Sequence, residues 1–152
     1  MGELRVTTAR TPAEMDDVLV VRRAVFIEEQ GVSEKEEIDA HDGDPAQVAS
    51  AVHVIAYLDG QPVATGRLLL DAMPPEHGYI GRVAVLREHR RSGYGREVMV
   101  ALQAEALRRG YPGITLAAQL HAIPFYERLG YVARGGVFLD ASIEHRWMDL
   151  RF

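Results

Sequence analysis

A short segment rich in glycine and arginine, Arg90–Arg96, constrains the fold of this chain more than any other feature. It lies between an expected strand over Tyr79–Leu86 and an expected helix over Tyr94–Arg109. Gly93 and Gly95 let the backbone turn tightly and approach a ligand closely. The unpaired N–H groups and the positive dipole end of the helix converge on the same turn, which suits a phosphate or pyrophosphate. The segment therefore predicts a strand–turn–helix unit that binds an anion.

The segment differs from two well-known phosphate-binding motifs. It lacks the Gly-Lys-Ser/Thr ending of a P-loop, and it is not the three-glycine fingerprint of dinucleotide-binding folds. Arg90, Arg91 and Arg96 add forked donors and positive charge. The alternative is that the glycines serve only a tight turn and that the arginines are merely exposed.

The remaining pattern predicts an α/β (α+β) fold. Hydrophobic periodicity and turn residues predict the order βα(α)βββαβαββ. We interpret this order as one mixed sheet of about seven strands with helices on both faces. The whole chain, residues 1–152, is expected to form a single domain. Strands are expected at Leu4–Thr8, Ala51–Leu58, Pro62–Leu70, Tyr79–Leu86, Ile114–Leu120, Val132–Leu139 and Ile143–Leu150. Helices are expected from Pro12 to about Glu29, at Ser33–Ile38, at Tyr94–Arg109 and at Ile123–Leu129. Asp59-Gly60 predicts a hairpin turn, and Met73–Gly78 predicts a longer turn.

Composition excludes several classes of function. The chain has no cysteine, which excludes a thiol nucleophile and cysteine-bound zinc. The net charge of −5 argues against nonspecific nucleic-acid binding, which needs a basic face. No membrane span or secretory signal is expected, so the predicted location is cytoplasmic. His41, Asp39 and Asp42 crowd one loop, but their spacing matches no strong ligand pattern, so no metal is expected.

Charge is unevenly distributed along the chain. The segment 28–44 holds eight carboxylates against one cation, Lys35, whereas the segment 82–96 is rich in arginine. One segment suits a cationic partner and the other an anionic one. For the acidic segment we favour the simpler interpretation, a solvated surface.

The chain contains two longer motifs. The first is Val83-Ala84-Val85 followed by Arg90-x-x-Gly93-x-Gly95, and the second is Ala122-x-x-Phe125-Tyr126-Glu127-Arg128-Leu129-Gly130-Tyr131. The first resembles motif A of the GNAT acetyltransferases, and the second resembles the closing element of that family. The stretch Arg22–Gln30 and the ending Phe138-x-Asp140-x-x-Ile143-x-His145 resemble its ElaA-like and YjcF-like bacterial branch. The resemblance covers nearly the whole chain. It departs from the family pattern at Arg91, where glycine is frequent, at Gln119, where asparagine is common, and at Tyr131, where phenylalanine is usual.

The resemblance implies acetyl-CoA as the donor of an acetyl group to a primary amine, by direct attack and without a metal. The pyrophosphate would be held by the turn, which comprises Arg90, Arg91, Ser92, Gly93, Tyr94, Gly95 and Arg96. The backbone of Val83, Ala84 and Val85 would pair with the pantetheine arm in a splay between the fourth and fifth strands, near Gln119. An N–H group in the splay would polarise the thioester carbonyl. The family often dimerises, so a homodimer is left open.

Two side chains are candidates for acid–base chemistry. By resemblance, Tyr126 would protonate the departing thiolate, while Phe125 packs in the core. His145 is the candidate base, because it lies on the last strand and histidine is the side chain best suited to exchange protons near neutral pH. The alternative for His145 is a packed histidine on an apolar strand face. His53, His121, Glu28 and Glu29 are weaker candidates.

The acceptor is not defined by the sequence. Arg22, Phe26 and Arg82 are expected to line its pocket; Arg22 and Arg82 favour an anionic amine, while the acidic segment favours a cationic one. Each arginine, Arg67 included, has an alternative role as a surface ion-pair partner. Two other functions stay open: a non-catalytic acyl-CoA-binding module, and a protein acetyltransferase, which needs an open peptide groove.

Overall fold

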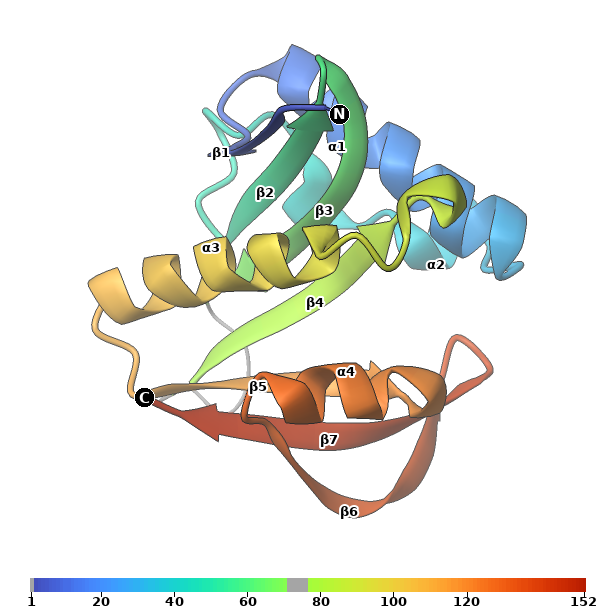
Figure 1. The fold of residues 1–152 in the computed structure, drawn as a ribbon, viewed down its shortest axis with the longest axis vertical. Coiled ribbons are helices and arrows are strands. Elements are labelled where there is room, and N and C mark those ends of the chain that lie inside the picture. The colour runs from blue at the N-terminus through green and yellow to red at the C-terminus, as the bar shows by residue number, and fades with distance from the viewer. Residues whose placement is uncertain (1, 71–76) are drawn as a thin grey trace.

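A single seven-stranded sheet forms the framework of the molecule. The computed structural model describes residues 2–70 and 77–152. The strands are arranged in the order β1-β2-β3-β4-β5-β7-β6, and neighbours are antiparallel except for the parallel pair β4 and β5 (Figure 1). Their bounds are β1 Leu4–Thr8, β2 Ala51–Leu58, β3 Gln61–Leu69, β4 Gly78–Val85, β5 Gly113–Gln119, β6 Val132–Asp140 and β7 Ile143–Arg151. The predicted mixed sheet is confirmed.

Helices cover both faces of the sheet. The α-helices are α1 Pro12–Arg22, α2 Glu34–Glu37, α3 Tyr94–Arg108 and α4 Ile123–Arg128; short turns are η1 Arg23–Glu29, η2 Ala40–Asp42, η3 Arg87–His89 and η4 Leu120–Ala122. Val54 and Ala56 of β2 pack in the core cluster of α3, whereas the intervening Ile55 packs with α1. Because successive side chains of a strand face opposite sides, α1 and α3 lie on opposite faces. None of the helices in the described ranges has the length and apolarity needed to cross a bilayer.

Most expected elements are found within two residues of their predicted bounds. Thr11 caps α1 by accepting from the Glu14 N–H, and Asp59 and Gly60 have φ values of 49° and 83°, as a tight hairpin turn requires. The first helix differs, because after Arg22 it continues as the π-helical segment η1. Seven residues are too few for periodicity to distinguish an α-helix from a π-helix. The turn expected at Met73–Gly78 lies mostly outside the described residues.

The two central strands separate soon after they meet. β4 and β5 are paired only at Gly78↔Ile114 and Tyr79↔Thr115, and β4 then diverges from β5 (Figure 1). On its other edge β4 carries a bulge, since Thr65 pairs with Ala84 but Arg67 pairs with Gly81. Arg82 lies in this bulge with a φ of 54°. The predicted splay is therefore confirmed, and it leaves backbone groups of both strands without a partner in the sheet.

Candidate functional site

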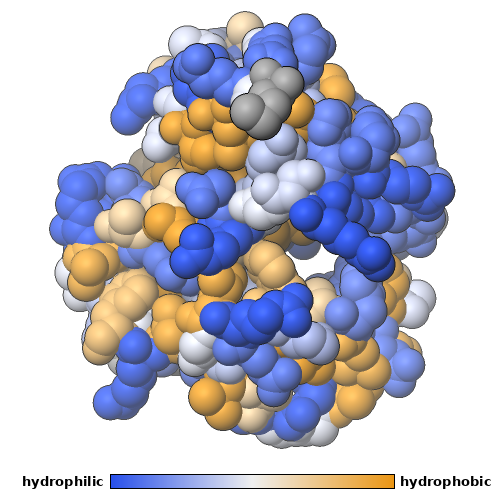
Figure 2. Space-filling model, viewed as in Figure 1, coloured by the Kyte–Doolittle hydropathy of each residue, from blue (hydrophilic) through white to orange (hydrophobic). Residues whose placement is uncertain are grey.

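A large cavity occupies the splay between β4 and β5. Its volume is about 1340 Å³, and in the space-filling view a gap is visible through the molecule between mostly hydrophilic surfaces (Figure 2). The predicted site residues that line it are Phe26, Arg82, Val83, Ala84, Val85, Arg90, Arg91, Gly93, Tyr94, Gly95, Arg96, Gln119, Tyr126 and His145. Ser92 and Arg22 are not among the described residues that line it. One cavity thus brings together almost all of the predicted residues.

The glycine turn opens α3 in the manner that an anion site requires. Gly93 is the N-cap of α3 with a φ of 82°, and Arg91 also has a positive φ, 66°. Within the described chain no side chain caps this helix, so the first N–H groups keep their hydrogen-bonding capacity. A Cβ on Gly93 would meet nothing within 4 Å, whereas one on Gly95 would lie 3.4 Å from Phe125 and Val85. Gly93 therefore faces open space and Gly95 faces the packed side.

Arg90 braces the turn. Its guanidinium donates to both oxygens of Glu29 at 2.7 Å, and its Nε donates to the Val85 carbonyl at 3.0 Å. Hydrogen bonds from Arg90 hold the pKa of Glu29 below its usual range. The charge of Arg90 is thus already matched by a carboxylate, which leaves Arg91 and Arg96 as the arginines with charge to offer an anion. No local sequence pattern indicated this contact between residues 61 positions apart.

Gln119 is engaged across the cavity. Its amide donates to the Gln30 oxygen at 2.8 Å, and the Gln30 amide donates back at 3.3 Å. This reciprocal pair joins the end of β5 to the residue that follows η1. Gln119 therefore lines the cavity with an amide that already has a hydrogen-bond partner. The observation that Gln119 stands where asparagine is common in the family could not reveal this partner.

Tyr126 presents a hydroxyl without a partner. The hydroxyls of Tyr57, Tyr111 and Tyr131 donate to Asp17, the Leu70 carbonyl and Gln103. The Tyr126 hydroxyl has no hydrogen bond within residues 2–70 and 77–152, although its ring is buried against Phe125 and Tyr131. Burial, with a smaller contribution from Tyr79, raises the pKa of Tyr126, so the phenol stays protonated. A protonated hydroxyl that lines a cavity and has no partner is suited to donate a proton to a ligand.

His145 is held in one orientation. Its Nδ1 lies 2.7 Å from the Ile143 carbonyl oxygen, and its ring stacks on Phe138. Since a carbonyl only accepts, Nδ1 carries the proton, and Nε2 keeps a basic lone pair. The side chain lines the cavity, although the residue is only 7% exposed. Both predicted roles, packing and proton acceptance, are compatible with this geometry.

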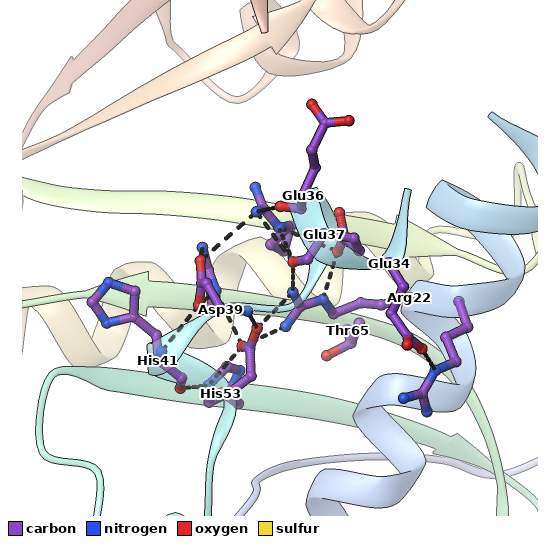
Figure 3. A network of polar contacts seen from close by, with 12 residues as sticks. Arg22, Glu34, Glu36, Glu37, Asp39, His41, His53 and Thr65 are labelled. Carbon is purple, nitrogen blue, oxygen red and sulfur yellow. Dashed lines mark hydrogen bonds and ion pairs between the residues drawn. The ribbon is translucent and has the colours of Figure 1, made fainter. Parts of the chain in front are cut away.

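Arg22 belongs to a buried ionic network. Its guanidinium donates to Glu37 at 2.8 Å and to both oxygens of Asp42 at 2.6 and 3.0 Å, and the residue is 1% exposed (Figure 3). Burial alone would lower the pKa of Arg22, but Asp42 and Glu37 raise it. The expectation that Arg22 binds the acceptor is corrected: it is inaccessible, and it holds α2 and η2 against η1.

The same network corrects our interpretation of the acidic segment at two of its eight carboxylates, while the other six are exposed or half-buried, as a solvated surface requires. Glu37 and Asp42 are buried, at 3% and 7% exposure, rather than solvated. Arg67 donates to Asp39 at 2.8 and 2.9 Å and to Asp42 at 3.0 Å, while Arg82 lies 3.2 Å from a Glu37 oxygen. The arginines are ion-pair partners, as the alternative held, but Arg22 and Arg67 are buried and Arg82 is half-buried. The sequence alone does not show whether a charged residue is buried or exposed, so it could not distinguish buried ion pairs from surface ones.

Further residues line the cavity without having been predicted. They include Gln30, Glu36, Arg128 and Asp140. Arg128 lies within the second motif and Asp140 within the ending motif, which were the available signals for them, whereas Glu36 is brought to the cavity by the fold. In the described ranges no group of three His, Cys, Asp or Glu side chains is arranged to hold a metal ion.

Comparison with known proteins adds independent information. The model of the acetyltransferase (GNAT) family matches residues 16–131. The uncharacterized N-acetyltransferase YjcF of Bacillus subtilis is 35% identical over 95% of this chain and 98% of its own. The crystal structure of an acyl-CoA N-acyltransferase from Pseudomonas aeruginosa superimposes with a TM-score of 0.78 at 30% identity, covering 98% of this chain and 99% of that one. That of Escherichia coli ElaA gives 0.79 at 25% identity, with the same coverage.

Proposed function

The chain belongs to the acetyltransferase (GNAT) family, and from this premise we propose that it transfers an acetyl group from acetyl-CoA to a primary amine of a small molecule. The observation that carries the proposal is the coincidence, in one cavity, of the splay, the open glycine turn and two free proton-transfer groups. Together they meet the requirements of amine acylation: a site for a polyanionic donor, a base and an acid.

The cofactor end of the cavity fits coenzyme A. The free N–H groups at the start of α3 and the open space beside Gly93 suit its pyrophosphate, and Arg91 and Arg96 supply positive charge. Backbone groups of Val83–Val85 have no partner on β5, so they are available to pair with the amide groups of the pantetheine arm. Arg90 supports this site through Glu29 and the Val85 carbonyl.

The proposed reaction is a direct transfer without a covalent enzyme intermediate. The Nε2 lone pair of His145 takes the proton of the bound ammonium group, and the neutral amine attacks the thioester carbon. A backbone N–H of the splayed β4 stabilises the negative charge that develops on the carbonyl oxygen. As the carbon–nitrogen bond forms, the carbon–sulfur bond breaks, and the Tyr126 hydroxyl gives its proton to the departing sulfur. The second proton, which the nitrogen loses on becoming an amide, returns to the Tyr126 oxygen and restores the phenol. General acid–base catalysis of this kind contributes about 10² to 10⁴ in rate.

Two measurements test the proposal. Calorimetry should detect binding of CoA, and release of free thiol from acetyl-CoA should depend on an added amine. Absence of heat with both CoA and acetyl-CoA would refute the proposal at its base. Binding without amine-dependent thiol release from any small amine would instead support an acyl-CoA-binding module, and new acetylation in a treated lysate would support a protein acceptor.

A further inference from the structure

The charges around the cavity are divided between its two ends. Near the glycine turn the lining includes Arg91, Arg96 and Arg128, for which no ion pair is found within residues 2–70 and 77–152. At the other end, the charged lining groups are Glu36, Glu37, Arg67, Arg82 and Asp140. If acetyl-CoA occupies the first end, the second end receives the amine, so its net charge selects the acceptor.

The arginines at the acceptor end are neutralised by neighbouring carboxylates. Three guanidinium groups, those of Arg22, Arg67 and Arg82, face three carboxylates in a continuous network; the carboxylates belong to Glu37, Asp39 and Asp42 (Figure 3). Both terminal nitrogens of Arg67 donate to carboxylates of the network, whereas its buried Nε has no hydrogen-bond partner in the described chain. Arg82 contacts the Glu37 carboxylate and the carbonyls of residues 36 and 37.

His53 adds no charge to this network at neutral pH. Burial lowers its pKa, and its Nε2 lies 2.8 Å from the His41 carbonyl, to which it donates. Protonation of Nδ1 would place a proton on a buried atom that has no hydrogen-bond partner in the described chain, beside Arg22 and Arg67. The network therefore contributes three positive and three negative charges.

Two carboxylates remain in excess at this end. Glu36 is exposed, and its side chain points away from the network (Figure 3); Ser33, which caps α2, donates to one of its oxygens at 3.0 Å. Asp140, at the end of β6, has no ion pair within the described residues. Burial and, next, the charge of Asp140 raise the pKa of Tyr79 on β4, so the field of Asp140 reaches the inner wall of the cavity. Glu36 and Asp140 thus contribute negative charge from two separate elements.

We infer, on the basis of the proposed function, that the acceptor is an amine with a second positive charge and no carboxylate, such as a diamine, a polyamine or a guanidino-amine. Glu36 and Asp140 attract the dication, and they hold its second charge after the reacting nitrogen has lost its proton to His145. A carboxylate on the acceptor would meet two unpaired carboxylates and only arginines that are already paired. The anionic-amine alternative therefore lacks a free cation at the site.

The test uses pairs of amines that differ by one carboxylate. Cadaverine is compared with lysine and agmatine with arginine, in an assay of thiol release from acetyl-CoA. We expect kcat/KM to be at least about tenfold higher for the decarboxylated member of each pair. Equal or better turnover of either amino acid would overturn the inference, and so would turnover of monoamines alone. In both cases the protein would still bind acetyl-CoA and thiol release would still depend on the amine, so the proposed function would stand.

Two substitutions connect the preference to the named carboxylates. Glu36→Gln and Asp140→Asn should each raise KM for the dication about two- to fivefold, as expected for partly exposed ion pairs, with little change in kcat or in acetyl-CoA affinity. Glu34→Gln is the matched control: it removes an exposed carboxylate from the same short helix, but Glu34 pairs with Arg23 and does not line the cavity. If Glu34→Gln raises KM as much as Glu36→Gln does, the effect is one of overall charge, and the assignment of Glu36 fails.

Discussion

Gly93 offers a direct test of the anion site, because the same helix supplies its own control. Gly93 precedes α3 with a φ of 82°, and Gly110 follows its end with a φ of 87°. A Cβ at either position would meet nothing within 4 Å. Substitution of each by valine therefore imposes the same left-handed strain on the two ends of one helix, and the new Cβ meets no other atom at either position.

The two variants should lose similar stability but differ in ligand binding. Left-handed strain costs about 1–2 kcal/mol for a residue with a Cβ, which lowers Tm by about 2–8 °C in a chain of this size. Gly93→Val also puts methyl groups into the space expected for the pyrophosphate. Loss of one hydrogen bond to a charged group costs about 1.5–3 kcal/mol, so Kd for CoA should rise about tenfold to a hundredfold.

The assay is calorimetric titration with CoA, with thermal unfolding measured on the same samples. Gly110→Val should bind CoA within about twofold of the unchanged chain, because a tenfold change needs about 1.4 kcal/mol at the site itself. The reasoning is refuted if Gly93→Val binds CoA as well as Gly110→Val does while both show the expected loss of Tm.

Three further outcomes are expected. Tyr126→Phe should lower kcat about a hundredfold with acetyl-CoA affinity nearly unchanged. The control is Tyr131→Phe, which removes a hydroxyl bonded to Gln103 outside the cavity and should lower stability by about 1 kcal/mol without changing kcat. Equal kcat in the two variants would remove Tyr126 from the mechanism. His145→Ala should abolish the rise of kcat with pH that a general base produces, and a persistent rise would assign the base elsewhere. Burial alone would raise the pKa of Asp42, but Arg22 and Arg67 hold it below its usual range, so the stability that Asp42 contributes is complete above about pH 4 and is lost as pH falls. In denaturant titrations, Asp42→Asn should therefore have a lower free energy of unfolding at pH 7, and that free energy should fall less steeply below about pH 4. An unchanged pH dependence of the free energy of unfolding would contradict this.

The ionic network explains why acceptor specificity was invisible in the sequence. The acidic segment and the arginines are far apart along the chain, and their formal charges suggested two opposite acceptors. Folding pairs Arg22 with Glu37 and Asp42 and leaves Glu36, one residue from Glu37, facing away from the network. Adjacent helical residues point in different directions, so identical side chains acquire different roles.

The glycine turn was predictable because its conformation depends on interactions that are local in the chain. Glycine at a position with positive φ, a helix that starts there and an arginine-rich flank are all encoded within seven consecutive residues. The order of strands and helices followed from hydrophobic period and caps in the same way. Contacts that join distant segments, such as Glu29 with Arg90 and Gln30 with Gln119, had no comparable local signal.

The sequence by itself determined the elements, the glycine turn that opens α3 and the resemblance to an acetyltransferase, because each depends on residues close together in the chain. Only the tertiary structure decided which charges are neutralised and which face the cavity. The physical reason is that the charge available to a ligand depends on burial and on partners, and the fold alone brings those partners together.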